Sequence, residues 1–336
     1  MKKNNLKVTI LGGAGFIGHN LALYLKKKSY NLQIIDSLTV NNLKSKKHVS
    51  TTNRDMYNAV LKNRLNLFKK SNLKIIPLDL KNINKFSKII KKFKPHYIIH
   101  LAAVSHANIS NKDPEYTFEH SFRTLMNTLG MCRKVKPHLI YFSSSMVYGN
   151  FNGKQVDEKN NCKPIGIYGN LKLAGEMMVK SFSHIFNFPY TIIRPSALYG
   201  ERCVSRRVGQ IFIENAIQGS EISINGNGSE KLDFTYIDDL IQGVERVIKS
   251  KNSINQTFNL TYGEGRSIKN LIDILKLNFP KIKVNFKERE KFVPKRGGLN
   301  INKAKKLIGY RPKYSIDKGY QRYINWYKNF FEKNKF

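Results

Sequence analysis

Residues Lys7-Val8-Thr9-Ile10-Leu11-Gly12-Gly13-Ala14-Gly15-Phe16-Ile17-Gly18 are the stretch that decides the fold. A short apolar run, typical of a buried strand, passes directly into spaced glycines, and a helical pattern follows from Phe16 to about residue 28. Gly12 permits a tight turn, Gly15 lets backbone N–H groups approach a pyrophosphate, and Gly18 lets the helix pack closely on the strand. The stretch therefore predicts a strand–turn–helix unit that binds a dinucleotide.

An acidic residue follows at the position that such a site requires. Asp36 closes the next apolar run, Asn31-Leu32-Gln33-Ile34-Ile35, eighteen residues after Gly18. A carboxylate there accepts hydrogen bonds from both ribose hydroxyls and repels the 2′-phosphate of NADP. We therefore expect the cofactor to be NAD.

The composition is that of a globular, reduced protein. The 336 residues are 41% hydrophobic and 11% aromatic, enough for a large domain and a smaller one. No apolar run reaches the roughly 18 residues that a membrane span needs, and the apolar run behind Met1-Lys2-Lys3 is already used as the first strand. The three cysteines and eight histidines are scattered, so we expect no metal site. Because the sequence shows neither a membrane span nor a signal peptide, we expect a cytoplasmic protein without a membrane partner.

The formal net charge of +36 has two interpretations. A strong positive charge attracts nucleic acid, a membrane surface or a phosphate-rich substrate. The basic residues are, however, spread along the whole chain, and no basic–aromatic motif stands out. Compositional bias is therefore favoured over a nucleic-acid partner, with attraction of an anionic substrate as a secondary benefit.

Apolar strand patterns alternate with helical patterns through the first two hundred residues. The expected strands are 7–11, 31–36, 73–78, 97–101, 139–142 and 190–194, and the expected helices are 16–28, 54–70, 83–93, 113–135 and 167–186. This alternation predicts an α/β fold with a doubly wound, Rossmann-type parallel sheet. We expect residues 1–200 to form the NAD-binding domain, with part of 233–260 returning to it, and residues 201–336 to form a smaller, interleaved substrate-binding lobe.

Candidate functional residues follow the ends of the expected strands, where doubly wound sheets bind their ligands. They are the glycine loop, Asp36, Asp79, Ala102-Ala103, the serines Ser143-Ser144-Ser145, and Pro195. Serine is also common in strand-end turns, so the serine run alone does not establish a catalytic role. The shared edge nevertheless predicts that these residues meet in one site.

Tyr168 and Lys172 stand four residues apart at the start of an expected helix and so share one of its faces. An ammonium beside a phenol favours the phenolate, which makes the tyrosine a usable base near neutral pH. Tyr24/Lys28 and Tyr314/Lys318 have the same spacing. Only Tyr168 follows the strand that ends in the serines, so it is the candidate base.

These motifs together resemble the extended short-chain dehydrogenase/reductase family, and more narrowly its NAD-dependent sugar-nucleotide epimerase/dehydratase branch, including members of the UDP-glucose 4-epimerase type. The residues that carry the resemblance are Gly12–Gly18, Asp36, Asp79-Leu80, His100-Leu101-Ala102-Ala103, Ser143–Gly149, Tyr168/Lys172 and Arg194–Gly200. The similarity continues through 228–239 and 302–312.

The resemblance implies a tightly held NAD that oxidises a sugar carbon, usually C4, and returns the hydride later. Tyr168 would be the base, Lys172 would bind the nicotinamide ribose and lower the pKa of Tyr168, and Ser144 would hold the sugar hydroxyl. The implied cofactor contacts are Gly12, Gly15, Phe16, Ile17, Asp36, Asp79, Leu80, Leu101, Ala102, Ala103, Tyr168, Lys172 and Pro195. The implied partners are a nucleotide-sugar substrate and a second copy of the chain, packed through the helix that carries Tyr168.

The residues before Val147-Tyr148-Gly149 help to choose the reaction. Family dehydratases resemble one another in having Thr-Asp-Glu there, whereas this chain has Ser144-Ser145-Met146. Eliminating water needs an acid and a base in addition to the tyrosine. Dehydration is therefore disfavoured, and C4 epimerisation is the leading hypothesis, with a 4-dehydrogenase or 4-ketoreductase as the alternative. A non-catalytic RNA-binding protein of this fold is the alternative from another class.

The residues expected around the substrate depart from the branch. Leu232 stands where an arginine for the diphosphate is usual, and Lys231 is expected to replace it as a point charge. Arg296 corresponds to a second diphosphate arginine, whereas Arg206-Arg207 face either the cleft or solvent.

Three further positions differ from the branch or border the sugar. Ala197, His120 and Arg123 replace an asparagine, another asparagine and a glycine. Ser105, Ser145 and His106 are expected beside the sugar.

Overall fold

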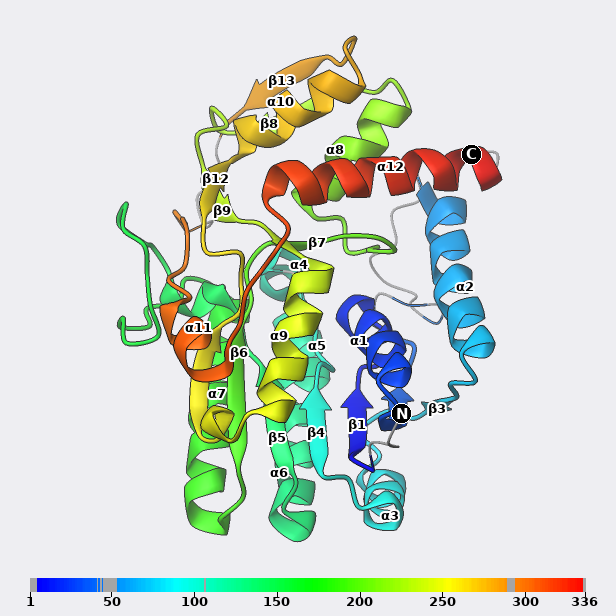
Figure 1. Ribbon diagram of the computed structural model, residues 1–336. Coiled ribbons are helices and arrows are strands. Elements are labelled where there is room, and N and C mark those ends of the chain that lie inside the picture. The colour runs from blue at the N-terminus through cyan, green and yellow to red at the C-terminus, as the bar shows by residue number, and fades with distance from the viewer. Residues whose placement is uncertain are drawn as a thin grey trace.

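A seven-stranded, fully parallel sheet forms the centre of the molecule in this computed structural model, which describes residues 5–40, 42, 44, 53–105, 107–288 and 294–334 (Figure 1). The strand order is β11-β6-β5-β4-β1-β2-β3. The strands are β1 (Lys7–Leu11), β2 (Asn31–Asp36), β3 (Ile75–Pro77), β4 (Tyr97–His100), β5 (His138–Phe142), β6 (Tyr190–Arg194) and β11 (Gln256–Asn259). The order reverses beside β1, so the glycine loop opens at a switch point of the sheet.

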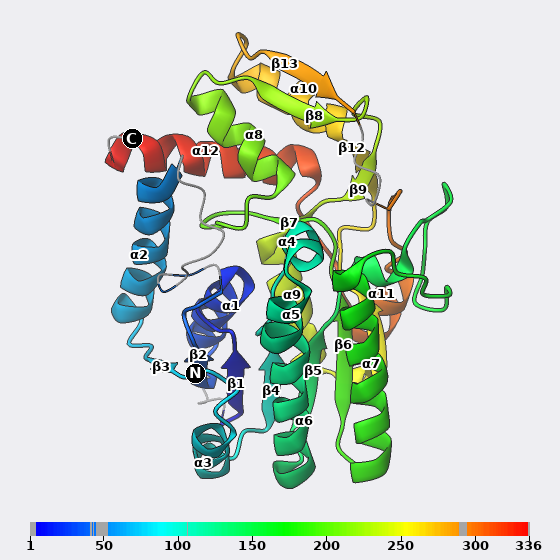
Figure 2. The same cartoon turned by 180° about the vertical axis from the view of Figure 1, so that it is seen from behind.

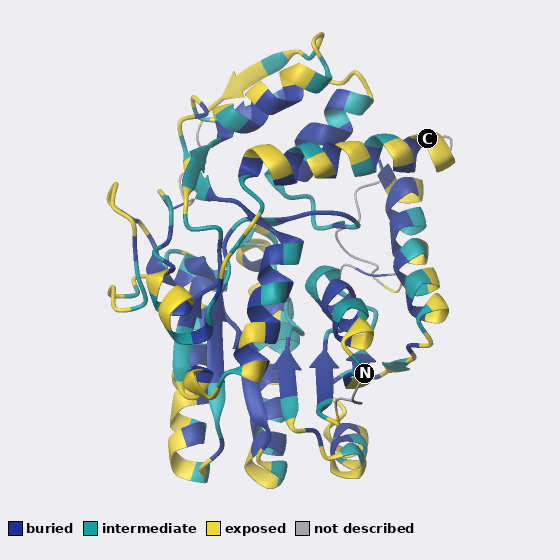
Figure 3. Ribbon diagram, viewed as in Figure 1, coloured by how far each residue is buried: buried dark blue, intermediate teal, exposed yellow. Residues whose placement is uncertain are grey.

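Helices cover both faces of the sheet. In Figures 1 and 2, α1 (Phe16–Lys27) and α9 (Ile237–Lys249) lie on one face, and α3 (Ile83–Phe93), α6 (Thr124–Val135) and α7 (Ile167–Phe186) lie on the other. Neighbouring residues of β1 enter different cores: Ile10 packs with α1 and α9, and Leu11 with α3, α6 and α7. Such strands are buried on both faces, as Figure 3 shows, and this explains their continuous apolar sequences. The doubly wound fold is confirmed.

The helix expected at 113–135 is more complex than its pattern indicates. It begins as expected, because Asp113 Oδ1 caps it by accepting from Tyr116 N at 3.0 Å. It then runs as α5 (Pro114–Thr117), a π-helical stretch η2 (Phe118–Arg123) and α6, after an unexpected α4 (Ala107–Lys112). Ser121 Oγ in the widened turn accepts from Val104 N at 3.0 Å. The π-helical stretch therefore occurs where Ser121 contacts a residue outside its own helix, and the spacing of apolar residues gives no sign of such a contact.

The edge strand β3 differs from the pattern expected from the sequence, whereas the helix before it has the expected bounds. The edge strand β3 is shorter than 73–78, because Leu73 N donates back to Phe68 O at the end of the preceding helix, at 2.9 Å. That helix, α2 (Arg54–Lys70), lies beside α1 and reaches toward the C-terminal end of the chain (Figure 1). Two short helical turns are also present: η3 (Ser145–Tyr148) follows β5, and η4 (Lys251–Ser253) lies between α9 and β11.

The later residues build a second layer of structure above the carboxyl edge of the sheet (Figure 1). Three two-stranded pairs are present: β7 (Leu198–Tyr199) with β10 (Thr235–Tyr236), β8 (Ile222–Asn225) with β13 (Val284–Lys287), and β9 (Lys231–Asp233) with β12 (Gly265–Ser267). The helices of this layer are α8 (Val208–Ile217), α10 (Ile268–Asn278) and α12 (Ile316–Asn334). Helix α11 (Asn302–Ile308) instead packs beside β11 of the central sheet (Figure 1). Buried tyrosines of α12, Tyr320, Tyr323 and Tyr327, pack in this region.

Across the described ranges, no helix has the length and apolar character that crossing a membrane requires.

Candidate active site

Backbone atoms leave no room for a side chain at Gly12 in the turn after β1 or at Gly18 in the helix that follows. Gly12 has φ +78°, and a Cβ there would lie 2.8 Å from Ala102 N at the end of β4. A Cβ on Gly18 would lie 2.5 Å from Gly12 O. Glycine is therefore required at both positions, because a side chain would collide with the backbone where the strand, the turn and the helix meet.

The neighbourhood of this turn fits a dinucleotide. Gly15 caps α1 without a side-chain hydrogen bond, and the described first turn of α1 carries no acidic residue, so its N–H groups and helix dipole suit an anion such as a pyrophosphate. Asp36 Oδ2 accepts from Ala14 N at 2.8 Å and Oδ1 from Leu38 N at 2.7 Å. Burial raises the pKa of Asp36, and these N–H groups oppose the shift. Each oxygen keeps a lone pair for a ribose hydroxyl.

The other expected cofactor residues line the same edge of the sheet. Leu101 N donates to Leu11 O at 2.9 Å, which places Leu101–Ala103 beside the glycine turn. Leu80 is buried, and its carbonyl accepts from Asn127 at 2.9 Å. Asp79 is half-buried beside it, and Phe16 and Ile17 form the first turn of α1. The residues present therefore fit the adenosine and pyrophosphate of NAD.

Ser144, Tyr168 and Lys172 converge on the far side of this edge. The Ser144 hydroxyl lies close enough to the Tyr168 phenol to lower its pKa, and it accepts from Met146 N at 3.2 Å. Lys172 Nζ donates to Phe142 O at 2.8 Å and lies 5.9 Å from the centre of the Tyr168 ring. Pro195, expected near the nicotinamide, accepts from Ser145 N at 2.9 Å. The arrangement brings together a hydroxyl, a phenol and an amine at the end of β5.

Burial and positive charge act in opposite directions on these groups. Burial raises the pKa of Tyr168, while Arg207, the Ser144 hydrogen bond and Arg296 lower it. Burial lowers the pKa of Lys172 to about 8, and Glu176 opposes this shift. The cations that favour the phenolate are therefore two guanidiniums that are distant in sequence.

A buried ion pair holds the elements of this site together. Glu176, one turn after Lys172 on α7, accepts from Arg194 Nε at 2.8 Å and Nη2 at 2.6 Å. It also accepts from Ser143 Oγ at 2.5 Å, and the Arg194 guanidinium lies 4.7 Å from the Tyr148 ring centre. The sequence analysis missed Glu176, although its spacing from Lys172 was a usable signal. The pair links β5, α7 and β6 beneath the catalytic candidates.

Two arginines approach Tyr168 from the later part of the chain. Arg207 donates to the carbonyl of Ser105, which places the expected sugar-side loop against the start of α8. Arg296 Nε is buried without a hydrogen-bond partner among the described residues. Each guanidinium acts electrostatically on Tyr168. Burial, and to a smaller extent the charge of Arg207, lowers the pKa of Arg296 to about 10. An unpaired guanidinium and a second cation beside it suit an anionic ligand.

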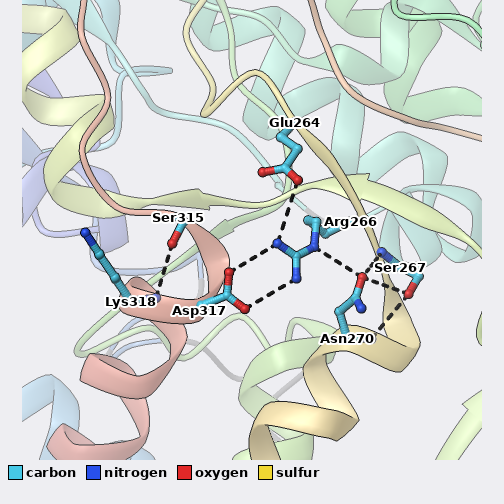
Figure 4. A network of polar contacts seen from close by, with 7 residues as sticks. All are labelled: Glu264, Arg266, Ser267, Asn270, Ser315, Asp317 and Lys318. Atoms are coloured by element: carbon cyan, nitrogen blue, oxygen red, sulfur yellow. Dashed lines mark hydrogen bonds and ion pairs between the residues drawn. The ribbon is translucent and has the colours of Figure 1, made fainter.

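The cross-strand partner of Leu232 does not supply the missing arginine. Arg266 on β12 is directly opposite Leu232 on β9. Figure 4 shows its guanidinium bound to Asp317, at 3.1 and 3.3 Å, with Glu264 at 3.7 Å. Lys231 is exposed on β9, and Ser145 is buried in η3. His106 lies outside the described residues.

Comparison with known proteins places the chain in a family. The sequence model of the NAD dependent epimerase/dehydratase family matches residues 8–261. The chain belongs to this family. A putative UDP-glucose 4-epimerase of Methanocaldococcus jannaschii is 30% identical over 96% of this chain and 98% of the relative. The UDP-glucuronate 4-epimerase of Thermodesulfobacterium geofontis is 28% identical over 96% of each chain.

A solved structure supports the same assignment. UDP-glucuronic acid 4-epimerase from Bacillus cereus, in complex with UDP-glucuronic acid and NAD, has a TM-score of 0.86 at 26% identity. The match covers 96% of this chain and 99% of that one. The family resemblance is therefore confirmed, and NAD is the cofactor, as Asp36 predicted. The roles of the individual site residues stay predictions.

Proposed function

We propose that this protein interconverts the C4 epimers of a uridine-diphosphate sugar through a transient 4-keto sugar. The observation that carries the proposal is the convergence of Ser144, Tyr168 and Lys172 beside a glycine turn that fits NAD. The relatives named above act on UDP-sugars at C4, which supports this substrate class.

Tyr168 removes the proton from the C4 hydroxyl, and Ser144 holds that oxygen in place with its own hydroxyl. Lys172 binds the nicotinamide ribose, and Arg207 and Arg296, rather than Lys172 as the sequence indicated, lower the pKa of the phenol. NAD, held by the glycine turn and Asp36, would supply the hydride chemistry, which is acceptance of a hydride from C4 and its return. Turning the keto sugar before this return presents its other face, and Tyr168 then gives the proton back.

The surroundings of Tyr168 favour epimerisation over loss of water. Two charged side chains shift the pKa of Tyr168, and both are arginines. Among the described residues, no carboxylate shifts it. Ser145 and Met146 stand in η3, where the family's dehydratases carry acids. Epimerisation needs only one proton acceptor, which is what the site provides.

We also propose that Arg296 and Arg207 bind the diphosphate and that the protein is a homodimer. Both guanidiniums act electrostatically on Tyr168, and Arg296 Nε is buried without a hydrogen-bond partner among the described residues. For the dimer, Met177 and Ile185 of α7 are 63% and 68% exposed, and Phe118 of η2 is 37% exposed. Met177 and Ile185, eight residues apart, share a helix face, so a second copy would cover an apolar surface.

The direct test uses purified protein with UDP-glucose, UDP-N-acetylglucosamine and UDP-glucuronate, with products separated by chromatography and weighed. Epimerisation gives an isomer of unchanged mass without net NADH. A product two mass units lighter with stoichiometric NADH would show a dehydrogenase, and loss of water would contradict the interpretation of Ser145 and Met146.

A further inference from the structure

Helix α2 has contacts that an ordinary crossover helix does not need. It connects β2 to β3, yet Figure 1 shows it standing outside α1, with its first turns near the end of α12. Its side chains bond both the cofactor turn and the later part of the chain. The contacts of two residues, Arg64 and Tyr57, carry the inference.

Arg64 bridges two loops with one buried guanidinium. The residue is 2% exposed. Its Nη1 donates to Ala14 O in the glycine turn at 3.2 Å, and its Nε donates to Arg202 O at 3.0 Å. Nη2 bonds the same Arg202 carbonyl. Ala14 N in turn donates to Asp36, the expected ribose acceptor, so two hydrogen bonds through Ala14 connect Arg64 to Asp36.

The loop that Arg64 reaches is held in an unfavourable backbone conformation. Arg202 has φ +63° and Arg206 has φ +48°, in the left-handed region that residues with a Cβ rarely adopt. Such a conformation persists only where its surroundings impose it. Arg202 bonds His19 Nε2 and Asn20 Oδ1 on α1, at 3.1 and 3.2 Å. The next residue after Arg206 is Arg207, which faces Tyr168.

Tyr57 makes a second attachment, one helical turn from the start of α2. Its hydroxyl accepts from Arg206 Nη1 at 3.3 Å and donates to Glu214 Oε2 on α8 at 2.7 Å. Glu214 is buried and also accepts from Tyr327 on α12 at 2.8 Å. One side of α2 therefore holds both ends of the Arg202–Arg206 loop.

We infer that α2 couples the two ligand sites: Arg64 and Tyr57 are positioning residues that keep the dinucleotide turn and the Arg207 loop in one joint arrangement. NAD binding then favours the arrangement that presents Arg207 to the diphosphate, and a bound nucleotide diphosphate retains NAD. Such coupling is reciprocal. The role of Arg207 rests on the proposed function, whereas the attachment of Arg64 to the cofactor turn does not.

The experiment measures NAD release from the purified holoprotein, with free NAD consumed by an auxiliary dehydrogenase, with and without saturating UDP. In the natural protein, UDP slows NAD release at least about 5-fold, a typical coupling strength. In Arg64→Met, NAD leaves faster and UDP no longer slows it, while Arg64→Lys restores part of the effect because an ammonium still reaches one carbonyl. Lys62→Met removes a charge from the exposed side of the same helix and behaves as the natural protein.

Tyr57→Phe tests the second attachment and replaces Arg64→Met if that variant does not fold. It leaves the helix packing in place. The rate of NAD release without UDP stays unchanged, and UDP slows NAD release less than in the natural protein. An undiminished UDP effect in both variants, or no UDP effect in the natural protein, overturns the coupling. Loss of the proposed function is distinguishable: UDP would still slow NAD release in a protein that epimerises no UDP-sugar.

Discussion

The cofactor side and the substrate side of the cleft are built in different ways. The cofactor side is built on the β1–α1–β2 unit, in which Asp36 closes β2 and the backbone of Gly12 closely approaches Ala102, just after the neighbouring strand β4. The proposed substrate side gathers Ser105, Arg207 and Arg296 from three distant segments, with the Arg207 side chain donating to the Ser105 carbonyl and its charge acting on Arg296. The first kind of site is encoded locally, whereas the second depends on how loops meet across the fold.

The largest expected effect falls where the two sides meet. Tyr168→Phe removes the proton acceptor and leaves the glycine turn intact. Turnover should fall at least about 1,000-fold, equivalent to roughly 4 kcal/mol of barrier. The NAD content of the purified variant should stay unchanged, as measured by acid extraction. Retention of the natural rate would remove Tyr168 from the mechanism.

The next largest effect tests the backbone origin of the cofactor side. Gly12→Ala places a Cβ 2.8 Å from Ala102 N at a residue with φ +78°, so we expect loss of NAD and about 2–4 kcal/mol of unfolding free energy. Gly130→Ala is the matched control, because a Cβ there meets nothing within 4 Å and the residue is helical. It should be neutral or stabilising by up to about 1 kcal/mol. Equal losses in both variants would contradict the role of the close approach.

On the substrate side, Arg207→Met should raise KM about 10- to 100-fold, because a guanidinium–phosphate contact is lost. The charge of Arg207 lowers the pKa of Tyr168, so its removal raises that pKa. Activity requires the deprotonated phenol, and the acidic limb of the kcat/KM profile should therefore move to higher pH. Lys231→Met, at the exposed residue that the sequence assigned to this task, should change KM less than 3-fold. The reverse order would restore the sequence assignment.

The smallest effect concerns the sheet beneath both sides. Burial lowers the pKa of His138 to about 4, below its usual value near 6.5. The folded protein then binds fewer protons than the unfolded chain between these values, so stability is lost as the pH falls from about 6.5 toward 4. The unfolding free energy, measured with urea, should therefore fall less between pH 6.5 and pH 4.5 in His138→Asn than in the natural protein, by about 1–2 kcal/mol. An unchanged pH dependence would exclude His138 as its source.

What could be predicted from the sequence follows the same division. Strand–helix alternation, the glycine turn and Asp36 are local patterns, and they were sufficient for the doubly wound fold and for NAD. The π-helical stretch at Phe118–Arg123 was not predictable from periodicity, because Ser121 contacts a residue outside its own helix. Arg64 was also missed, since its position in an amphipathic helix resembles any other basic residue. Its burial against Ala14 and Arg202 is evident only in three dimensions.

The central claim is that the hydrogen at C4 leaves and returns within one active site. The most direct measurement uses UDP-glucose and UDP-glucuronate carrying deuterium at C4, with the products analysed by mass and by proton NMR. The account predicts a C4 epimer of unchanged mass that retains the deuterium at C4, without accumulation of NADH. A product that has lost the deuterium to the cofactor pool, or that has lost water, would contradict it.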